Sequence, residues 1–142
     1  MFGSIVLGVD ESNHAKRAVD VVRRMAKLSG DHVIVVHIRP LGTYGRGGPM
    51  VDEDLSEATA FVESVVKDLA GDGVEAEAMV ATADKSRIGR SLLDIAKERD
   101  AGLIAVGTRG RGEATTLVLG SVAHDVIHES EVPVLIVRDL DA

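Results

Sequence analysis

A glycine-rich loop between an apolar run and a helical segment is the stretch of this chain best suited to bind an anion. It lies between Gly102 and Val126. The run Leu103–Val106 predicts a buried strand, and the residues after Gly120 and Ser121 have the apolar spacing of a helix. Backbone N–H groups of such a loop and of a helix start can face an anion. We therefore predict that this stretch holds the phosphates of a nucleotide.

The glycines and the serine of this loop each have a physical role in that hypothesis. Gly107, Gly110 and Gly120 permit close approach of the backbone to a bulky anion, while Ser121 can cap the helix and offer a hydroxyl group to a phosphate. The alternative is a loop that needs its glycines only for turning. The loop matches neither a Walker motif nor the dinucleotide pattern G-x-G-x-x-G.

The composition favours one globular domain, residues 1–142, and excludes several kinds of function. The chain has a net charge of -7 and only three aromatic residues, Phe2, Tyr44 and Phe61. Nucleic-acid binding needs clustered Lys and Arg or aromatic stacking faces, so we expect no nucleic-acid partner. The absence of cysteine excludes disulfides, thiolate catalysis and cysteine-based zinc sites.

The distribution of apolar residues predicts a cytoplasmic protein without a membrane segment. The N-terminal stretch has no basic region and turns polar at Asp10, unlike a signal peptide. No apolar run approaches the roughly 20 residues that a membrane helix needs.

Alternating strands and helices are predicted along the whole chain. Apolar runs predict strands at residues 4–9, 32–38, 74–80, 103–106 and 132–137, and helical spacing falls in the segments between them. We expect Arg39–Pro40 to stop the second strand and Leu41–Met50 to form a flexible glycine-rich flap. Acidic residues alternate with apolar ones in the third strand, which predicts a sheet edge. The order β-α-β-α-β-α-β-α-β predicts an α/β fold: a doubly wound, Rossmann-like, five-stranded parallel sheet with helices on both faces and strand order 3-2-1-4-5.

Ligands of such a sheet bind outside the carboxyl ends of the strands, where the strand order reverses. That rule selects Asp10 after the first strand, Ile38–Arg39 after the second and Gly107 after the fourth. These places converge if the first and fourth strands are neighbours.

The spacing Gly107-x2-Gly110-x9-Gly120-Ser121 resembles the nucleotide-binding signature of the universal stress protein family. Further segments in the same order resemble the family's first, second and fourth strands, its last helix start and its last strand. These segments are Ile5–Asp10, Val35–Ile38, Leu103–Gly107, Gly120–Ala123 and Val132–Val137.

The resemblance is to the ATP-binding branch of that family and implies roles for particular residues. Asp10 would contact the ribose, and backbone groups near Val9 and Ile38 the adenine. The ribose and α-phosphate would lie against Gly107, Arg109 and Gly110, and the outer phosphates against Gly120, Ser121 and Val122. The resemblance further implies a Mg²⁺ or Mn²⁺ ion with the phosphates and a homodimer formed through the last strand, Val132–Val137.

Three positions depart from the family's pattern. Glu11 stands where glycine is common, Gly102 where aspartate is common before the fourth strand, and Glu113–Thr115 replaces a small, serine-rich segment. A carboxylate near a triphosphate is unfavourable unless it points away or shares the metal. The choice between ATP and ADP or AMP therefore stays open.

The predicted pocket contains no histidine-paired nucleophile and no evident general base. We therefore expect a stress-response regulator that binds a nucleotide, forms a dimer and acts on an unidentified protein partner, with at most weak ATP hydrolysis. The alternatives are a slow ATPase and a nucleotide-free dimeric interaction module. His124 and His128 have the i, i+4 spacing of a helical zinc pair, but they fall on the polar side of their helix and lack a third ligand. We expect a solvated helix face there.

Overall fold

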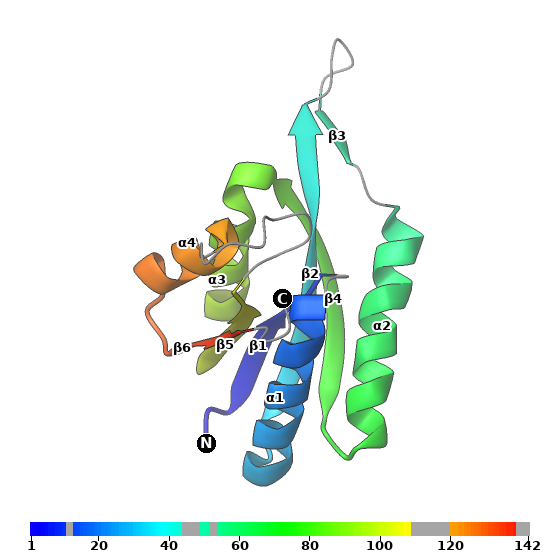
Figure 1. The fold of residues 1–142 in the computed structure, drawn as a ribbon, viewed down its shortest axis with the longest axis vertical. Coiled ribbons are helices and arrows are strands. Elements are labelled where there is room, and N and C mark those ends of the chain that lie inside the picture. The colour runs from blue at the N-terminus through cyan, green and yellow to red at the C-terminus, as the bar shows by residue number, and fades with distance from the viewer. Residues whose placement is uncertain (11–12, 44–48, 52–53, 109–119, 139–142) are drawn as a thin grey trace.

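Five parallel strands form the centre of the fold, in the order predicted from the sequence (Figure 1). The first strand lies in the middle, with the second on one side and the fourth parallel strand on the other. The third and fifth parallel strands add to the two outer sides. In chain order the strands are β1 (Ser4–Gly8), β2 (His32–Thr43), β4 (Ala76–Asp84), β5 (Leu103–Gly107) and β6 (Val134–Val137). The predicted order 3-2-1-4-5 is confirmed.

The computed structural model describes residues 1–10, 13–43, 49–51, 54–108 and 120–138. Its helices are α1 (Asn13–Ser29), α2 (Leu55–Gly71), α3 (Ile88–Glu98), which a 3₁₀ turn at Lys85–Arg87 precedes, and α4 (Ser121–Glu129). Within the described part of the chain, each helix is too short or too polar to cross a lipid bilayer.

The helices cover both faces of the sheet and create two aliphatic cores (Figure 1). Successive strand residues point to opposite faces, so Leu7 and Val35 pack against α1 and α2, while Val6 and Ile34 pack against α3 and α4. All four side chains are almost fully inaccessible to solvent. This burial explains why the strands are continuous runs of β-branched and aliphatic residues rather than alternating ones.

The second strand does not stop at Arg39–Pro40 as predicted, but continues to Thr43. Val36 directs its carbonyl group toward β1, where it accepts from the Val9 amide. Pro40 lies four residues after Val36, an even number, so its nitrogen faces the same side of the strand, the side of β1. At this level β1 has already ended, because its last residue is Gly8. A proline is compatible with a strand where no ladder hydrogen bond is required of it, and β4 continues to pair with β2 as far as Leu41.

A short sixth strand, β3 (Pro49–Val51), departs from the loop predicted at Leu41–Met50. It pairs antiparallel with the end of β2, and its register joins Leu41 to Val51 and Thr43 to Pro49. Figure 1 shows this extension projecting beyond the carboxyl ends of the other strands. Residues 44–48 of the predicted flap lie outside the described residues.

The outer strands β4 and β6 are each paired on one side among the described strands. The edge position predicted for the third parallel strand is therefore confirmed. In β6, Val134, Leu135 and Ile136 are half-buried, which leaves an apolar edge with unpaired backbone groups.

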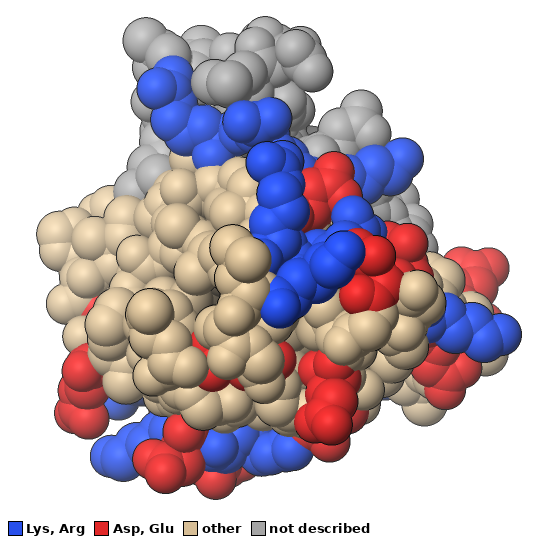
Figure 2. Space-filling model, turned by 90° about the horizontal axis from the view of Figure 1, so that it is seen from below, with Lys and Arg blue, Asp and Glu red and all other residues tan. Residues whose placement is uncertain are grey.

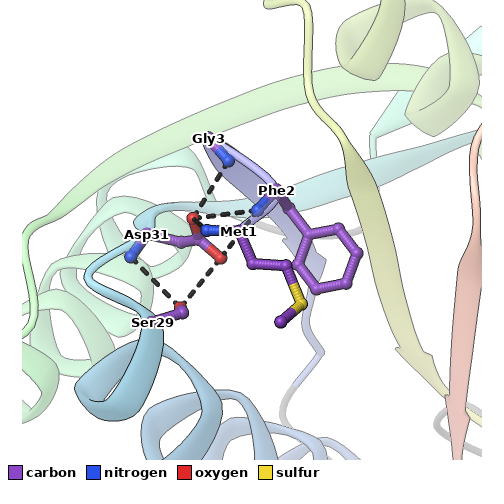
Figure 3. Close-up of polar contacts among 5 residues, drawn as sticks. All are labelled: Met1, Phe2, Gly3, Ser29 and Asp31. Carbon is purple, nitrogen blue, oxygen red and sulfur yellow. Dashed lines mark hydrogen bonds and ion pairs between the residues drawn. The ribbon is translucent and has the colours of Figure 1, made fainter.

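Asp31 ties together the amino ends of β1 and β2 (Figure 3). Its carboxylate accepts hydrogen bonds from the N-terminal ammonium group of Met1 (2.9 Å), the amides of Phe2 (3.0 Å) and Gly3 (2.9 Å), and the hydroxyl group of Ser29 (2.8 Å). The Met1 ammonium group makes the largest contribution to lowering the pKa of Asp31, which falls from 3.8 to about 2 despite the opposing effect of burial. The start of the chain is thereby fixed at the turn between α1 and β2.

An ion-pair network joins α1 to α2 on the surface. Arg23 contacts Asp20 (Nη1 to Oδ1, 2.6 Å) and Asp68, and Lys27 contacts Asp72 (Nζ to Oδ1, 3.1 Å). Seen from below, Lys and Arg side chains lie directly beside Asp and Glu side chains on this end of the molecule (Figure 2). Exposed pairs of this kind stabilise a fold by about 0–1 kcal/mol each.

Candidate functional site

The carboxyl ends of β1, β2 and β5 lie side by side, which brings the predicted site residues to one edge of the sheet. Leu7 is opposite Ala105 in one ladder, and Gly8 is opposite Val36 in the other. The chain leaves β1 through α1 on one face and enters β5 through α3 on the other face. This edge is therefore the point at which the strand order reverses, where doubly wound sheets bind their ligands.

Val9, Asp10 and Ile38 follow the sequence prediction in reaching this edge. Val9 and Ile38 are buried, with 7% and 5% of their surface exposed, and Asp10 is half-buried. The amide of Val9 donates to the carbonyl oxygen of Val36 (2.9 Å). Its N–H group is therefore already engaged, and a ligand at this position would have to use the carbonyl oxygen or the side chain of Val9.

His37 supports this edge of the site, and sequence reasoning missed it. Its Nδ1 lies 2.8 Å from the carbonyl oxygen of Val9. Because a carbonyl oxygen can only accept, Nδ1 carries the hydrogen. The ring is buried and meets Phe61 edge to face, with the ring centroids 6.0 Å apart. A histidine inside an otherwise aliphatic strand was the available signal, since a buried imidazole needs a polar partner.

We expect His37→Phe to lower the free energy of unfolding by about 1–2 kcal/mol, because it removes a donor from the Val9 carbonyl while keeping a planar ring against Phe61. Chemical denaturation measures the loss, and amide hydrogen exchange at Val9 and Asp10 should accelerate in the same variant. Phe61→Leu is the control, since it disturbs the ring contact and keeps the hydrogen bond. Equal exchange rates at Val9 in His37→Phe and the unmodified protein would contradict this role for His37.

The end of β5 and the start of α4 are joined directly. The amide of Thr108 donates to the carbonyl oxygen of Val137 (3.0 Å), and the amide of Gly120 donates to the carbonyl oxygen of Thr108 (2.6 Å). Gly107 and Gly120 are thus brought to one place, as the loop hypothesis requires. Arg109 and Gly110, which the sequence also assigns to the site, lie outside the described residues.

The first turn of α4 presents backbone N–H groups, and the prediction that Ser121 caps the helix is wrong. Gly120 occupies the N-cap position with φ −63° and ψ 154°, and no side chain of the described residues caps this helix. The amide of His124 donates to Gly120 within the helix (2.8 Å), so the N–H groups of Ser121, Val122 and Ala123 have no acceptor inside it. Such a helix end favours negative charge.

His124 and His128 are both exposed, as predicted for a solvated helix face. Their ring centroids are 4.3 Å apart. Among the residues that the structure describes, no group of three or more His, Asp or Glu side chains is placed to hold a metal ion.

Known proteins resemble the chain along nearly its full length. The sequence model of the universal stress protein family matches residues 1–138. A universal stress protein of Thermus aquaticus is 36% identical over 140 residues, which cover 97% of this chain and 100% of the relative. The solved structure of a universal stress protein from Archaeoglobus fulgidus has a TM-score of 0.75 at 33% identity and covers 96% of this chain and 99% of its own.

A universal stress protein from Archaeoglobus fulgidus in complex with dAMP is also similar. It has a TM-score of 0.72 at 30% identity, and the match covers 96% of this chain and 98% of the other. The family match extends over the strands, the switch point and the last helix described above. The chain belongs to the universal stress protein family.

Proposed function

We propose that this protein binds an adenine nucleotide, ATP or its ADP or AMP forms, and serves as a regulatory stress-response protein. The observation that carries the proposal is the position of α4. Its first turn, which no side chain of the described residues caps, is joined through Gly120 to the end of β5. That turn lies at the sheet edge that also carries Asp10. The relative in complex with dAMP supports an adenine nucleotide as the ligand.

In this proposal the two ends of the nucleotide have different partners. Asp10 accepts from the ribose, and Val9 and Ile38 line the adenine. Gly107, together with Arg109 and Gly110, receives the ribose and the first phosphate. The outer phosphates lie at the helix start, against Gly120, Ser121 and Val122. A helix N-terminus and its N–H groups provide the charge and the donors that a phosphate needs.

A divalent cation, Mg²⁺ or Mn²⁺, fits this site as a companion of the phosphates. Mg²⁺ is commonly bound through one or two carboxylates, water and substrate phosphates, not by a cage made of protein side chains alone. Because Asp10 contacts the ribose in this proposal, phosphate oxygens and water would supply most of the ligands of the ion. The ion would neutralise the charge of the phosphates.

A homodimer formed through the last strand is the second part of the proposal. The edge of β6 carries half-buried apolar residues, and a second copy of the strand would satisfy its backbone groups. We propose that bound nucleotide changes this dimer or the surface that it presents to a protein partner.

The proposal is tested by identifying any nucleotide that remains bound through purification, followed by calorimetry. One portion of the protein is heat-denatured, and the released compound is identified by chromatography. A second, folded portion from which nucleotide has been removed is titrated with adenosine, AMP, ADP and ATP, with and without Mg²⁺. Binding of none of these would overturn the proposal, and rapid multiple-turnover hydrolysis of ATP would replace the regulator by an enzyme.

Gly120→Val is expected to lower the affinity for ADP and ATP about 100-fold, because a branched side chain would fill the space in front of the first turn of α4, where the outer phosphates lie in this proposal. Ser121→Ala is the matched control, since it removes a hydroxyl group and keeps every backbone N–H group. It should weaken binding about tenfold or less. Calorimetry measures both affinities. Unchanged affinity in a folded Gly120→Val variant would exclude this helix start from the site.

A further inference from the structure

Helix α3 packs its first turn against the first turn of α4, and a glycine makes this contact possible. A Cβ atom added at Gly89 would lie 2.7 Å from Cβ of Asp125 and 3.3 Å from the carbonyl oxygen of Val122. Both neighbours belong to α4. Separations below 3.0 Å between such atoms are essentially never seen, so any larger residue at position 89 forces the two helices apart.

The smaller and less anchored helix of the pair is α4. Helix α3 inserts Leu92, Ile95 and Ala96 into the core, and all three are buried. The nine residues of α4 contribute only two buried side chains, those of Ala123 and Val126. An added methyl group at position 89 should therefore displace α4 rather than α3.

That displacement would move the backbone N–H groups at the start of α4. Restoring an ordinary contact distance of 3.4 Å or more between position 89 and Asp125 requires a shift of roughly 0.7 Å. Val122, whose carbonyl oxygen takes part in this contact, also carries one of the N–H groups at the helix start. The hydrogen bond from Gly120 to Thr108 holds the helix start from the strand side, and Gly89 limits its position from the side of α3.

We infer that Gly89 is a positioning residue that sets the affinity of the site for the outer phosphates of its nucleotide. This inference rests on the proposed function. The adenosine end of the proposed site is built from Val9 and Asp10, which follow β1, and from Ile38 of β2. None of these is on α4, so adenosine alone should not sense the shift of α4.

The test compares ATP with adenosine by calorimetry in the unmodified protein and in Gly89→Ala. The affinity for ATP, whose outer phosphates lie at the start of α4 in the proposed site, should fall about tenfold in the variant, while the affinity for adenosine stays unchanged. Gly71→Ala is the matched control, because position 71 is also helical and no atom lies within 4 Å of its added Cβ. This control should leave both affinities unchanged. A loss of stability alone would not alter the ratio of the two affinities.

A compensating substitution sharpens the test. Asp125→Gly removes the Cβ atom that the added methyl group meets, so the double variant Gly89→Ala/Asp125→Gly should recover the ATP affinity of the unmodified protein. If Gly89→Ala does not fold, the double variant carries the test alone, and a tenfold fall in its ATP affinity would overturn the inference. Equal losses for ATP and adenosine in folded Gly89→Ala, or no loss for either, would overturn it as well.

The two levels of the hypothesis fail in different ways. If the unmodified protein binds none of ATP, AMP and adenosine, the proposed function fails and the role of Gly89 fails with it. If the unmodified protein binds ATP more tightly than adenosine and Gly89→Ala keeps that preference, only the role of Gly89 is wrong.

Discussion

Gly102→Asp is expected to lower the free energy of unfolding by about 3 kcal/mol and the melting temperature by about 10 °C. A Cβ atom at this position would lie 2.2 Å from the carbonyl oxygen of Phe2 and 3.0 Å from its carbonyl carbon. Both are backbone atoms, which cannot turn aside as a flexible side chain can. The amide of Gly102 also donates to the carbonyl oxygen of Ser4 (2.9 Å), so moving the two segments apart would break a hydrogen bond as well.

The choice of aspartate makes this prediction informative, because it is the residue that the resemblance to the family would suggest at this position. Gly102→Ala separates the steric effect from the charge and should cost nearly as much, whereas Gly71→Ala has open space around it and should not destabilise the protein. Thermal and chemical denaturation measure all three. A Gly102→Asp variant as stable as the unmodified protein would show that the segment at Phe2 shifts without cost.

Asp31→Asn is expected to lower the free energy of unfolding by about 2 kcal/mol at neutral pH. The pKa of Asp31 falls from 3.8 to about 2, mainly through the Met1 ammonium group and against the cost of burial, and each pKa unit corresponds to about 1.4 kcal/mol. The asparagine keeps one acceptor oxygen but presents an amide group to donors that need a carboxylate. Chemical denaturation at pH 7 measures the loss. Asp94→Asn, at an exposed position of α3, is the control and should change little.

The same substitution predicts a pH dependence with a defined sign. The pKa of Asp31 is lower in the folded state than its ordinary value, so the folded protein binds fewer protons at this group. Its contribution to stability is fully present above about pH 4 and is lost as the pH falls through about 2. The difference in stability between the unmodified protein and Asp31→Asn should therefore shrink over this range. A difference that is independent of pH would contradict the role of the charge.

The parallel sheet was predictable because its strands carry their own signal. The runs around Val6, Val35 and Ile104 are buried on both faces, so they contain almost no polar residue and stand out from the helices between them. The extent of β2 was not predictable. Whether Pro40 stops a strand depends on whether a neighbouring strand still requires its N–H group, and that neighbour, β1, ends before it.

The general place of the site followed from the rule for strand ends, but its supporting contacts did not. His37, Gly89 and Gly102 act through atoms of segments distant in sequence: Val9, Asp125 and Phe2. A single sequence shows which residues are small or polar, but not which segments they will face. Gly120 rather than Ser121 occupies the N-cap position because α4 begins at Ser121. Local residue preferences define such a helix start only to within a position or two.

The hydrogen bond between Thr108 and Gly120 has a consequence for how this protein responds to substitutions between these two residues. Its donor and its acceptor are both backbone atoms, the amide of Gly120 and the carbonyl oxygen of Thr108. A side-chain substitution at positions 109–119 therefore removes neither partner of the contact. Such variants can change what the side chains offer to a ligand while the strand end and the helix start keep the hydrogen bond that joins them.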